Sequence, residues 1–478
     1  MNFSMIFTVL GWVSCFNAVF QLLPAFVGIM YQEKAAWSFI VTAVLSLGAG
    51  LLLLIKKPKN KTLYAKEGFV IVSLSWIIMS LFGALPLYIS GAAPEFIDAL
   101  FESVSGFTTT GASVIPLVEE IPKCCLIWRS FTHWIGGMGV LVFIMAILPL
   151  SGAGNMNLMR AESPGPMVGK LVPKVRTTAF LLYAMYFGLT LLEFIILLAA
   201  DMSVFNAVNT AFATAGTGGF GFYNDSMGSF SPSIQIIVTI FMILFGINFN
   251  MYFLLLYRRF KDAFRISEVW VYLGIIFISA GIITFNIKDM YTSIGEAARH
   301  SAFTVGSVIT TTGFSTADFN TWPELSRTIL LTLMFIGACA GSTGGGMKVS
   351  RFIIMFKTIA KEMKIQIHPK LVKKIKMDGH EVSHETVRSL NIYLIVYIII
   401  FSVSVLILAI EGHDFITNFS AVAATLNNIG PGLELVGPTE NFQFFSVPSK
   451  LVLIFDMLAG RLELFPMLLL FSPWTWKK

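Results

Sequence analysis

Apolar residues gather along this chain into long, nearly unbroken runs that are separated by short polar stretches. A helix needs about 20 apolar residues to cross the hydrocarbon core of a bilayer. Ten runs fit such a crossing, at 3–30, 36–55, 68–90, 126–150, 178–200, 233–257, 268–287, 327–357, 390–410 and 450–472. The pattern therefore predicts an all-α, polytopic membrane protein with ten transmembrane helices.

Four shorter apolar runs lie between these predicted helices, at 94–107, 203–215, 293–309 and 414–427. They are too short to cross a bilayer and too apolar for loops in water, and such lengths are typical of re-entrant segments. From residue 67 onward the order is helix, short run, helix, four times over. We therefore expect four pseudo-symmetric repeats of helix, pore loop and helix around one central pore, preceded by an N-terminal helix pair. The expected boundaries are 1–66 for the helix pair and 67–160, 161–262, 263–380 and 381–478 for the repeats.

Composition and charge support the membrane assignment. Of 478 residues, 56% are hydrophobic and 13% charged, and the mean hydropathy is +0.77. Soluble domains carry roughly 25% charged residues, so too few polar side chains remain here to cover a surface in water. Most of the 33 basic residues follow the second, fourth, sixth and eighth predicted helices or end the chain. Because basic loops stay in the cytoplasm, we expect both termini there and attribute the net charge of +6 to topology, with no nucleic-acid partner.

The four short runs lead into related sequences, each with a closing glycine. These sequences are FESVSGFTTTGAS (101–113), NTAFATAGTGGFG (209–221), FTVGSVITTTGFS (303–315) and FSAVAATLNNIGPG (419–432). The closing glycines are Gly111, Gly219 (or Gly218), Gly313 and Gly430. A single TTTG stretch would be explained by close helix packing through small residues. Four such stretches, each between two predicted helices and all on the same side, favour a pore instead.

A dehydrated cation in a pore needs oxygen atoms that replace its water, and converging loops supply rings of backbone carbonyls in potassium channels. Glycine reaches the backbone angles that turn consecutive carbonyls inward, threonine adds a hydroxyl oxygen without charge, and short helices direct their partly negative C-terminal ends at the ion. The predicted selectivity filter comprises Thr109, Thr110, Gly111, Thr217, Gly218, Gly219, Thr311, Thr312, Gly313, Asn428, Ile429 and Gly430. We expect the cation to be held at Thr109, Thr110, Thr217, Gly218, Thr311, Thr312, Asn428 and Ile429.

Together with further motifs, these loops resemble the Trk/Ktr/HKT superfamily of potassium transporters, in particular its TrkH/TrkG-type membrane subunits. The resemblance covers essentially the whole chain and includes HWIGGMGVLVF (133–143), RAESPGP (160–166), GACAGSTGGGMKVSR (337–351), AATLNNIGPG (423–432) and AGRLELFP (459–466). It implies uptake of K⁺ across the bacterial cytoplasmic (inner) membrane, with K⁺ as the ion in the filter and no organic cofactor. It also implies a homodimer with one pore in each protomer and a cytosolic, nucleotide-binding TrkA-type regulatory subunit.

The eighth predicted helix is interrupted by GACAGSTGGGMK (337–348), which we call the glycine loop. It holds five glycines, and each glycine disfavours a helix by about 1 kcal/mol relative to alanine. A phosphate-binding loop is excluded, because Met347 separates the last glycine from Lys348 and Val349 stands where that motif needs serine or threonine. We expect instead an intramembrane gate under the filter, as the resemblance also implies. Its residues are Gly341, Ser342, Thr343, Gly344, Gly345, Gly346 and Lys348.

Arg461 lies in the middle of the last apolar run, where a charged side chain costs about 2.5–3.5 kcal/mol on insertion scales. An ion pair with Asp456 or Glu463 would explain such an arginine, but positions i−5 and i+2 do not share its helix face. We therefore expect the guanidinium of Arg461 to line the pore below the filter, as an electrostatic barrier to cations until the glycine loop moves.

Two other classes of function compete with a gated pore. A secondary transporter working by symport with H⁺ or Na⁺ would also use broken helices, with Glu193 and Asp98 as candidate coupling residues. Such a transporter would be expected to have an acidic residue near the middle of the membrane, whereas the four loops here are neutral. The sequence does not decide between passive flux and flux coupled to H⁺ or Na⁺. A membrane enzyme is excluded, since no set of His, Cys and carboxylates stands at catalytic spacing in the apolar runs. Because two loops carry TTTG, one TGG and one NIG, we expect K⁺ to be preferred over Na⁺ less strictly than in a tetrameric channel.

Overall fold

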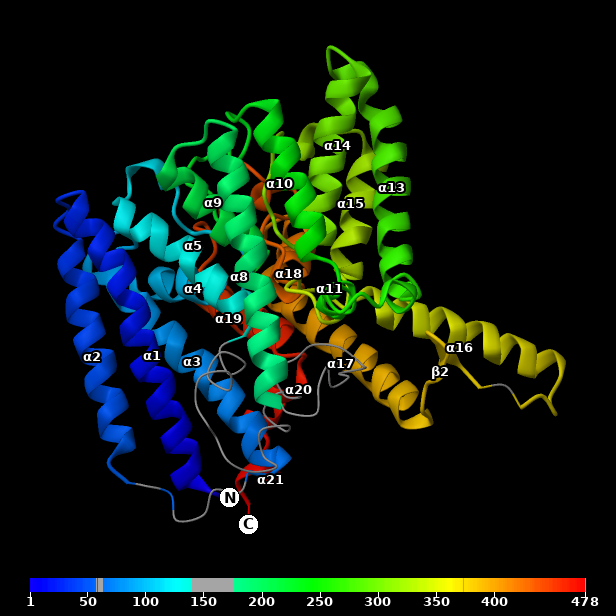
Figure 1. The fold of residues 1–478 in the computed structure, drawn as a ribbon, viewed down its shortest axis with the longest axis horizontal. Helices are drawn as coiled ribbons and strands as arrows, with labels where there is room; N and C mark the ends of the chain where they lie inside the picture. The colour runs from blue at the N-terminus through cyan, green and yellow to red at the C-terminus, as the bar shows by residue number, and fades with distance from the viewer. Residues whose placement is uncertain (57, 59–62, 140–174, 373, 478) are drawn as a thin grey trace.

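The computed structural model describes residues 1–56, 58, 63–139, 175–372 and 374–477. These residues are mostly helical (Figure 1). The second part of the predicted helix 126–150, the RAESPGP motif and the predicted boundary at 160 lie outside the described residues.

Two long helices begin the chain and cover one side of the molecule. α1 (Phe3–Met30) and α2 (Ala36–Leu54) pack along each other, and α1 also packs against α3 (Ala65–Ile89) (Figure 1). The backbones of α1 and α2 meet at Gly11 and Gly50. A Cβ atom added to Gly50 would lie 2.8 Å from the carbonyl oxygen of Gly11. Close approach through small residues is a common way for membrane helices to pack without polar contacts.

Six helices of the described residues are long and apolar enough to cross a membrane, or seven spans are present if one bent pair of helices is counted as a single span. The six are α1, α2, α3, α8 (Val175–Ala199), α13 (Ser267–Ile287) and α17 (His384–Leu408). The bent pair is α10 (Pro232–Phe245) with α11 (Phe249–Leu256), whose axes meet at 89°.

Three of the predicted transmembrane helices are not continuous, and a fourth is described only in part. The predicted helix 233–257 divides into α10 and α11, and the predicted helix 327–357 divides into α15 (Glu324–Ile336) and α16 (Val349–Ile367). The predicted helix 450–472 divides into α19 (Val447–Arg461) and α20 (Phe465–Phe471). Of the predicted helix 126–150, the described residues show the start, which lies in α5 (Lys123–Gly137). The last break has a backbone cause, because Glu463 and Leu464 have φ values of 61° and 66° and interrupt the helical path. The count of ten transmembrane helices therefore stays a prediction.

Short helices form in the four short apolar runs. They are α4 (Phe96–Phe107), α9 (Val204–Gly216), α14 (Ile294–Ile309) and α18 (Phe415–Leu426). The last three begin at polar caps, since the side chains of Ser203, Ser293 and Asp414 each accept a backbone N–H from three residues further on. The short helices pack against α5, α10, α15 and α19 in turn, and their C-terminal residues are buried.

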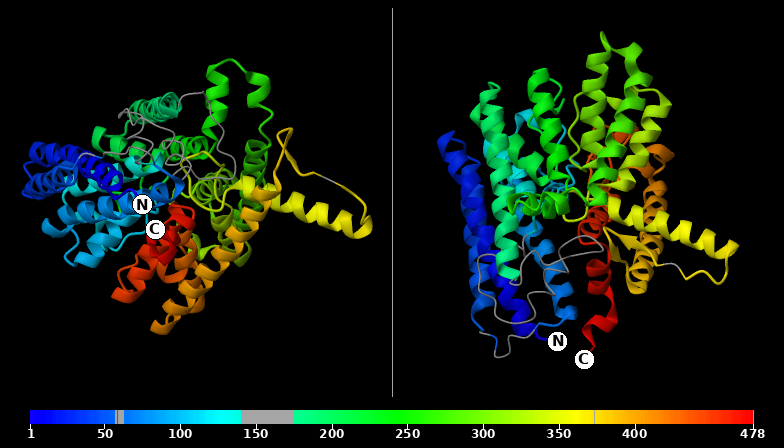
Figure 2. Two further views of the ribbon diagram at one scale, coloured as in Figure 1. Left: turned by 90° about the horizontal axis from the view of Figure 1, so that it is seen from below. Right: turned by 45° about the vertical axis from the view of Figure 1, so that its right-hand side comes forward.

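One group of elements leaves the helical bundle sideways. α16 extends away from the other helices, and the chain returns to α17 through the antiparallel hairpin of β1 (Lys376–Met377) and β2 (His380–Glu381) (Figures 1 and 2). The hairpin turn holds Asp378 and Gly379 at φ values of 50° and 83°, as a type I′ turn requires. This hairpin departs from the all-α prediction, and the direction of α16 shows that the predicted run 327–357 does not continue straight across.

The two ends of the described chain lie side by side at the same end of the molecule (Figure 1). Lys66 Nζ donates a 2.8 Å hydrogen bond to the carbonyl oxygen of Lys477, which ties the start of α3 to the C-terminal segment. Shorter elements complete the fold: α12 (Phe260–Ala263), α21 (Pro473–Trp476) and single 3₁₀ turns at Val118–Glu120, Lys288–Met290, Phe319–Thr321, Ala409–Glu411 and Glu434–Val436.

Candidate ion pathway

The loops that follow α4, α9, α14 and α18, which we call the re-entrant loops, share one backbone conformation. In each, a non-glycine residue with φ between 53° and 59° is followed two positions later by a glycine with φ between 72° and 102°. The first set is Thr109, Thr217, Thr311 and Asn428, and the second is Gly111, Gly219, Gly313 and Gly430. The second loop therefore matches the others at Gly219, whereas Gly218 has no positive φ.

The hydrogen bonds at the four helix ends are also equivalent. Backbone N–H groups of Thr110, Gly218, Thr312 and Ile429 donate to carbonyls five residues earlier, at 2.8–2.9 Å. One position earlier, the backbone N–H of the left-handed residue in each loop donates to the carbonyl three residues before it. This pair of bonds is the Schellman ending of a helix, which usually places glycine at its left-handed position. Threonine or asparagine there is strained by about 1–3 kcal/mol, and such strain often marks functional sites.

The four loops close into a ring. A Cβ atom added to Gly111 would meet the carbonyl oxygen of Gly218, one added to Gly219 would meet that of Thr312, and one added to Gly313 would meet that of Ile429. The cycle is completed by Gly430, whose added Cβ would lie 2.8 Å from the carbonyl oxygen of Thr110. Each glycine thus lies against the carbonyl that precedes the glycine of the next loop, so a side chain at these positions would force the ring apart.

The ring offers oxygen ligands without charge. Its threonine, asparagine and isoleucine members are fully buried, and the described residues contain no group of three or more His, Cys, Asp or Glu side chains that could hold a metal ion. The C-terminal ends of the short helices, which carry partial negative charge, lead into the loops. A cavity of about 100 Å³ opens where the loops continue beyond their glycines, and all four closing glycines line it. This arrangement is suited to a cation held by carbonyl and hydroxyl oxygens.

The glycine loop lies directly against this ring, on the side of the short-helix ends. The backbone N–H of Gly345 donates a 2.6 Å hydrogen bond to the hydroxyl of Thr311. Little space separates the glycine loop from the ring. A Cβ atom added to Gly345 would lie 2.6 Å from the carbonyl oxygen of Asn427, and one added to Gly344 would lie 2.8 Å from the carbonyl oxygen of Thr310. On its other side, the loop hydrogen-bonds to the break between α10 and α11, where the Cys339 N–H donates to the Gly246 carbonyl at 3.1 Å.

Arg461 contacts the glycine loop at the end of α19. Its Nη1 donates to the carbonyl of Thr343 at 3.0 Å, and its Nη2 donates to the carbonyls of Gly136 and Gly137 at 2.5 and 2.8 Å. The guanidinium therefore joins the loop to the C-terminal end of α5. The carboxylates that the sequence suggested as its ion-pair partners are engaged elsewhere, since Glu463 pairs with Arg351 and Asp456 accepts a 2.9 Å hydrogen bond from Ser404.

Lys348 lies inside this assembly. It is 1% exposed, and its Nζ donates to the carbonyl of Gly344 within the glycine loop. Of the other predicted gate residues, Ser342 donates to the Cys339 carbonyl at 2.6 Å, and Gly341 and Gly346 have positive φ values of 71° and 73°. The structure thus brings the predicted gate residues and the predicted filter residues into one connected site.

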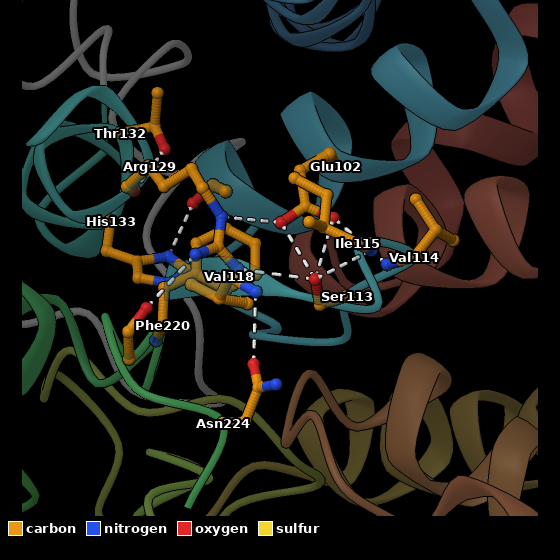
Figure 3. A network of polar contacts seen from close by, with 12 residues as sticks. Glu102, Ser113, Val114, Ile115, Val118, Arg129, Thr132, His133, Phe220 and Asn224 are labelled. Carbon is orange, nitrogen blue, oxygen red and sulfur yellow. Dashed lines mark hydrogen bonds and ion pairs between the residues drawn. The ribbon is translucent and has the colours of Figure 1, made fainter. Parts of the chain in front are cut away.

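Sequence reasoning missed a buried ion pair beside the ring. Arg129 of α5 and Glu102 of α4 are joined at 2.6 Å, and Arg129 also donates to the carbonyl of Gly221 at 3.0 Å and to the hydroxyl of Ser113 at 3.3 Å (Figure 3). These contacts link the first re-entrant loop to the second. The available signal was the presence of ionisable residues inside apolar runs, which are expensive in a membrane unless they are paired.

His133 forms a second link between the first and second re-entrant loops. Its Nδ1 lies 2.8 Å from the carbonyl oxygen of Gly106 in α4, and its Nε2 accepts a 3.2 Å hydrogen bond from the N–H of Phe220 (Figure 3). Because Nε2 accepts, Nδ1 carries the proton in this neutral tautomer. A further buried ion pair, at 2.5 Å, joins the side chains of Lys450 in α19 and Asp98 in α4.

Comparison with known proteins connects this geometry to a family. The TrkH family, described as cation transport protein, matches residues 35–270 and 287–477. The Trk system potassium uptake protein TrkH of Escherichia coli (strain K12) is 37% identical over 485 residues that cover 100% of both chains. TrkG of the same strain is 33% identical, covering 98% of this chain and 97% of the relative. The crystal structure of the potassium transporter TrkH from Vibrio parahaemolyticus matches with a TM-score of 0.89 and 34% identity, covering 100% of both chains.

Proposed function

Because this chain belongs to the TrkH family of cation transport proteins, and is thus a transporter and not an enzyme, we propose that it takes up K⁺ through the ring of re-entrant loops. The names of its relatives, Trk system potassium uptake proteins TrkH and TrkG, supply the ion and the direction. The observation that carries the path is the closed ring, in which each glycine lies against a carbonyl of the next loop.

The proposed selectivity filter consists of the twelve residues predicted from the sequence. Carbonyl oxygens ahead of each closing glycine, with threonine hydroxyls, replace the water around K⁺. The ring supports this role because its residues are neutral and its four loops share one conformation. Asn428 and Ile429 stand where the first and third loops have threonines, so the site is not strictly fourfold. We therefore expect K⁺ to be preferred over Na⁺ less strictly than in a tetrameric channel.

The equivalence of the four loops also supports four pseudo-symmetric repeats, with the boundaries predicted from the sequence. In this proposal the breaks between α10 and α11, between α15 and α16 and between α19 and α20 each interrupt one crossing of a ten-helix topology, and α16 leaves the bundle after its break (Figure 1). The membrane is the bacterial cytoplasmic (inner) membrane. Cytoplasmic termini agree with their position at one end of the molecule (Figure 1) and with the basic loops of the sequence.

The glycine loop is the proposed gate. The hydrogen bond from Gly345 to Thr311 supports this role because it brings the loop into contact with the ring, and Arg461 adds positive charge beside the loop. In this arrangement the loop obstructs a cation leaving the filter, and the guanidinium repels it. Opening requires the loop to withdraw from Thr311. We propose that a cytosolic, nucleotide-binding TrkA-type subunit drives this movement, and that two copies of the chain form a homodimer with separate pores.

A K⁺ transporter coupled to H⁺ or Na⁺ is the second candidate, and one buried carboxylate favours it. Glu193 in α8 is fully buried beside Thr214 of α9 and takes part in none of the ion pairs found in the described residues. Asp98, the other candidate coupling residue, is already paired with Lys450. Coupling would therefore depend on Glu193.

Uptake of ⁸⁶Rb⁺ into liposomes that contain the purified protein tests the proposed function. A K⁺-loaded liposome should accumulate Rb⁺, and external K⁺ should compete with it more effectively than Na⁺. The uptake should not respond to a pH gradient. A response to pH or Na⁺ at a fixed K⁺ gradient would support coupled transport, and Glu193→Gln should then remove it. Because the proposed gate limits resting uptake, both proposals would be contradicted by the absence of Rb⁺ uptake above that of empty liposomes in the wild type and also in the gate variant Arg461→Ala.

A further inference from the structure

Glu268, in the first turn of α13, holds the glycine loop at its base. Its carboxylate is buried, with 2% of the residue exposed. The same oxygen, Oε1, accepts the backbone N–H of Ala340 within the loop at 2.7 Å and the N–H of Ser350 in the first turn of α16 at 3.0 Å. A carboxyl oxygen has two lone pairs, so Oε1 can accept both hydrogen bonds at once. One carboxylate thus fixes the loop relative to the helix that follows it.

The β1–β2 hairpin is attached to the residue before Glu268. Asp378, in the hairpin turn, accepts hydrogen bonds at its Oδ1 from the backbone N–H of Ser267 at 2.9 Å and from the Ser267 hydroxyl at 2.6 Å. On the other side, Lys357 of α16 donates to the Lys376 carbonyl of β1 at 2.9 Å. The hairpin, the start of α13 and the glycine loop therefore form a continuous chain of contacts.

Open space borders this chain of contacts. A cavity of about 530 Å³ is lined by Glu268, Ala340, Ser350 and Asp378, among others. Because the cavity touches both the loop and the hairpin turn, a displacement of the hairpin is not blocked by close packing at this point. The hairpin itself is exposed except at Met377, so it is accessible from the side on which α16 projects.

We propose that Glu268 is a positioning residue for the glycine loop and that the β1–β2 hairpin, through Asp378 and Ser267, transmits displacement from the aqueous phase to the loop. Withdrawal of Asp378 loosens the start of α13, weakens the hold of Glu268 on Ala340, and lets the loop leave the ring. The inference rests on the proposed gating function, because it assigns the control of that gate. It adds a route by which a protein that binds the exposed hairpin could act on the pore.

Rb⁺ flux in liposomes tests the role of Glu268. Glu268→Ala should raise the resting flux about tenfold or more, since both backbone hydrogen bonds that Glu268 accepts are lost. Glu268→Gln keeps an acceptor oxygen and should restore most of the low resting flux. Glu385→Ala is the matched control, since Glu385 is an exposed acid in the first turn of α17. If the wild type conducts and Glu268→Ala behaves as Glu385→Ala does, the inference is wrong, whereas the absence of flux in the wild type, Glu268→Ala and Glu385→Ala alike would count against the proposed function itself.

A second measurement does not depend on transport. Cys339 is fully buried in the glycine loop, next to Ala340, and reports whether the loop has moved. In protein whose other cysteines (Cys15, Cys124 and Cys125) are replaced by alanine, a water-soluble thiol reagent should label Cys339 faster in Asp378→Ala and Glu268→Ala. Asp378→Asn keeps Oδ1 and should label at the parent rate. Equal protection of Cys339 in Asp378→Ala and in the parent would exclude transmission through the hairpin, even if one Glu268 variant fails to fold.

Discussion

The backbone N–H of Gly345 donates a 2.6 Å hydrogen bond to the hydroxyl of Thr311. This bond joins the glycine loop to the re-entrant loop after α14, at a residue whose own backbone is left-handed with φ 59°. The proposed gate and the proposed filter are therefore in direct contact. Substitutions on either side of this bond should therefore affect the resting flux.

Thr311→Val should raise resting Rb⁺ flux several-fold. Valine keeps the shape of threonine but cannot accept the hydrogen bond from Gly345, and a neutral hydrogen bond contributes about 1 kcal/mol, or roughly fivefold in a population. Thr311→Ser retains the hydroxyl and should stay near the wild-type flux. Flux assays on liposomes with equal protein content make the comparison. Equal fluxes for the valine and serine variants would show that this hydrogen bond does not hold the gate.

Arg461→Ala should also raise resting Rb⁺ flux, because it removes both a positive charge near the path and the bond that holds the Thr343 carbonyl. The effect should exceed that of Thr311→Val, since three carbonyl contacts of the guanidinium are lost. Arg388→Ala, at an exposed position of α17, is the control for loss of a basic residue. Unchanged flux in folded Arg461→Ala protein would show that Arg461 does not hold the gate closed.

Gly345→Ala should displace the glycine loop from the ring. The new Cβ would lie 2.6 Å from the carbonyl oxygen of Asn427, and backbone cannot yield as a flexible side chain can. We expect a raised resting flux with normal K⁺ over Na⁺ preference. Gly48→Ala in α2, where no atom lies within 4 Å of the added Cβ, should leave the flux unchanged. A Gly345→Ala variant that conducts as the wild type does would show that the loop is not confined there.

Arg129→Ala should lower the free energy of unfolding by about 3–5 kcal/mol, because it leaves the buried carboxylate of Glu102 unpaired. Thermal stability in detergent, followed by the loss of the monodisperse peak in size-exclusion chromatography, reports the change. Arg259→Ala removes an exposed pair with Asp262 and should cost less than about 1 kcal/mol. The double variant Glu102→Gln, Arg129→Gln should recover part of the loss. Equal stability of the two alanine variants would contradict the structural role of the buried pair.

The sequence was sufficient to predict the features with a local cause. Short helices form in the four short apolar runs, whose length and apolar character are visible in the sequence, and the glycine loop interrupts its helix because glycine disfavours one. The equivalence of Thr109, Thr217, Thr311 and Asn428 follows from the spacing to each closing glycine, although the sequence left the choice between Gly218 and Gly219 in the second loop open. The apolar pattern wrongly predicted one continuous helix over 233–257, however, because α10 and α11 meet at 89° within that run.

Contacts between segments that are distant in the sequence could not be predicted from it. The two bonds of Glu268 cross 72 and 82 residues, and the ion pair between Lys450 and Asp98 crosses 352. A single sequence contains no measure of such proximity. The positions nevertheless carried a general signal, because each is an ionisable residue within or at the end of an apolar run, where an unpaired charge is costly.

The central claim is that K⁺ passes through the ring of re-entrant loops, and the K⁺ to Na⁺ permeability ratio of Gly430→Ala tests it most directly. An added Cβ there lies 2.8 Å from the Thr110 carbonyl oxygen, at φ 102°, so the ring must distort. The ratio is obtained from reversal potentials in opposed K⁺ and Na⁺ gradients, with Gly281→Ala in α13, where the added Cβ meets no atom within 4 Å, as the control. We expect a ratio above one in the wild type and the control, and a ratio near one in Gly430→Ala. An unchanged ratio in conducting Gly430→Ala protein would mean that the ion takes another path.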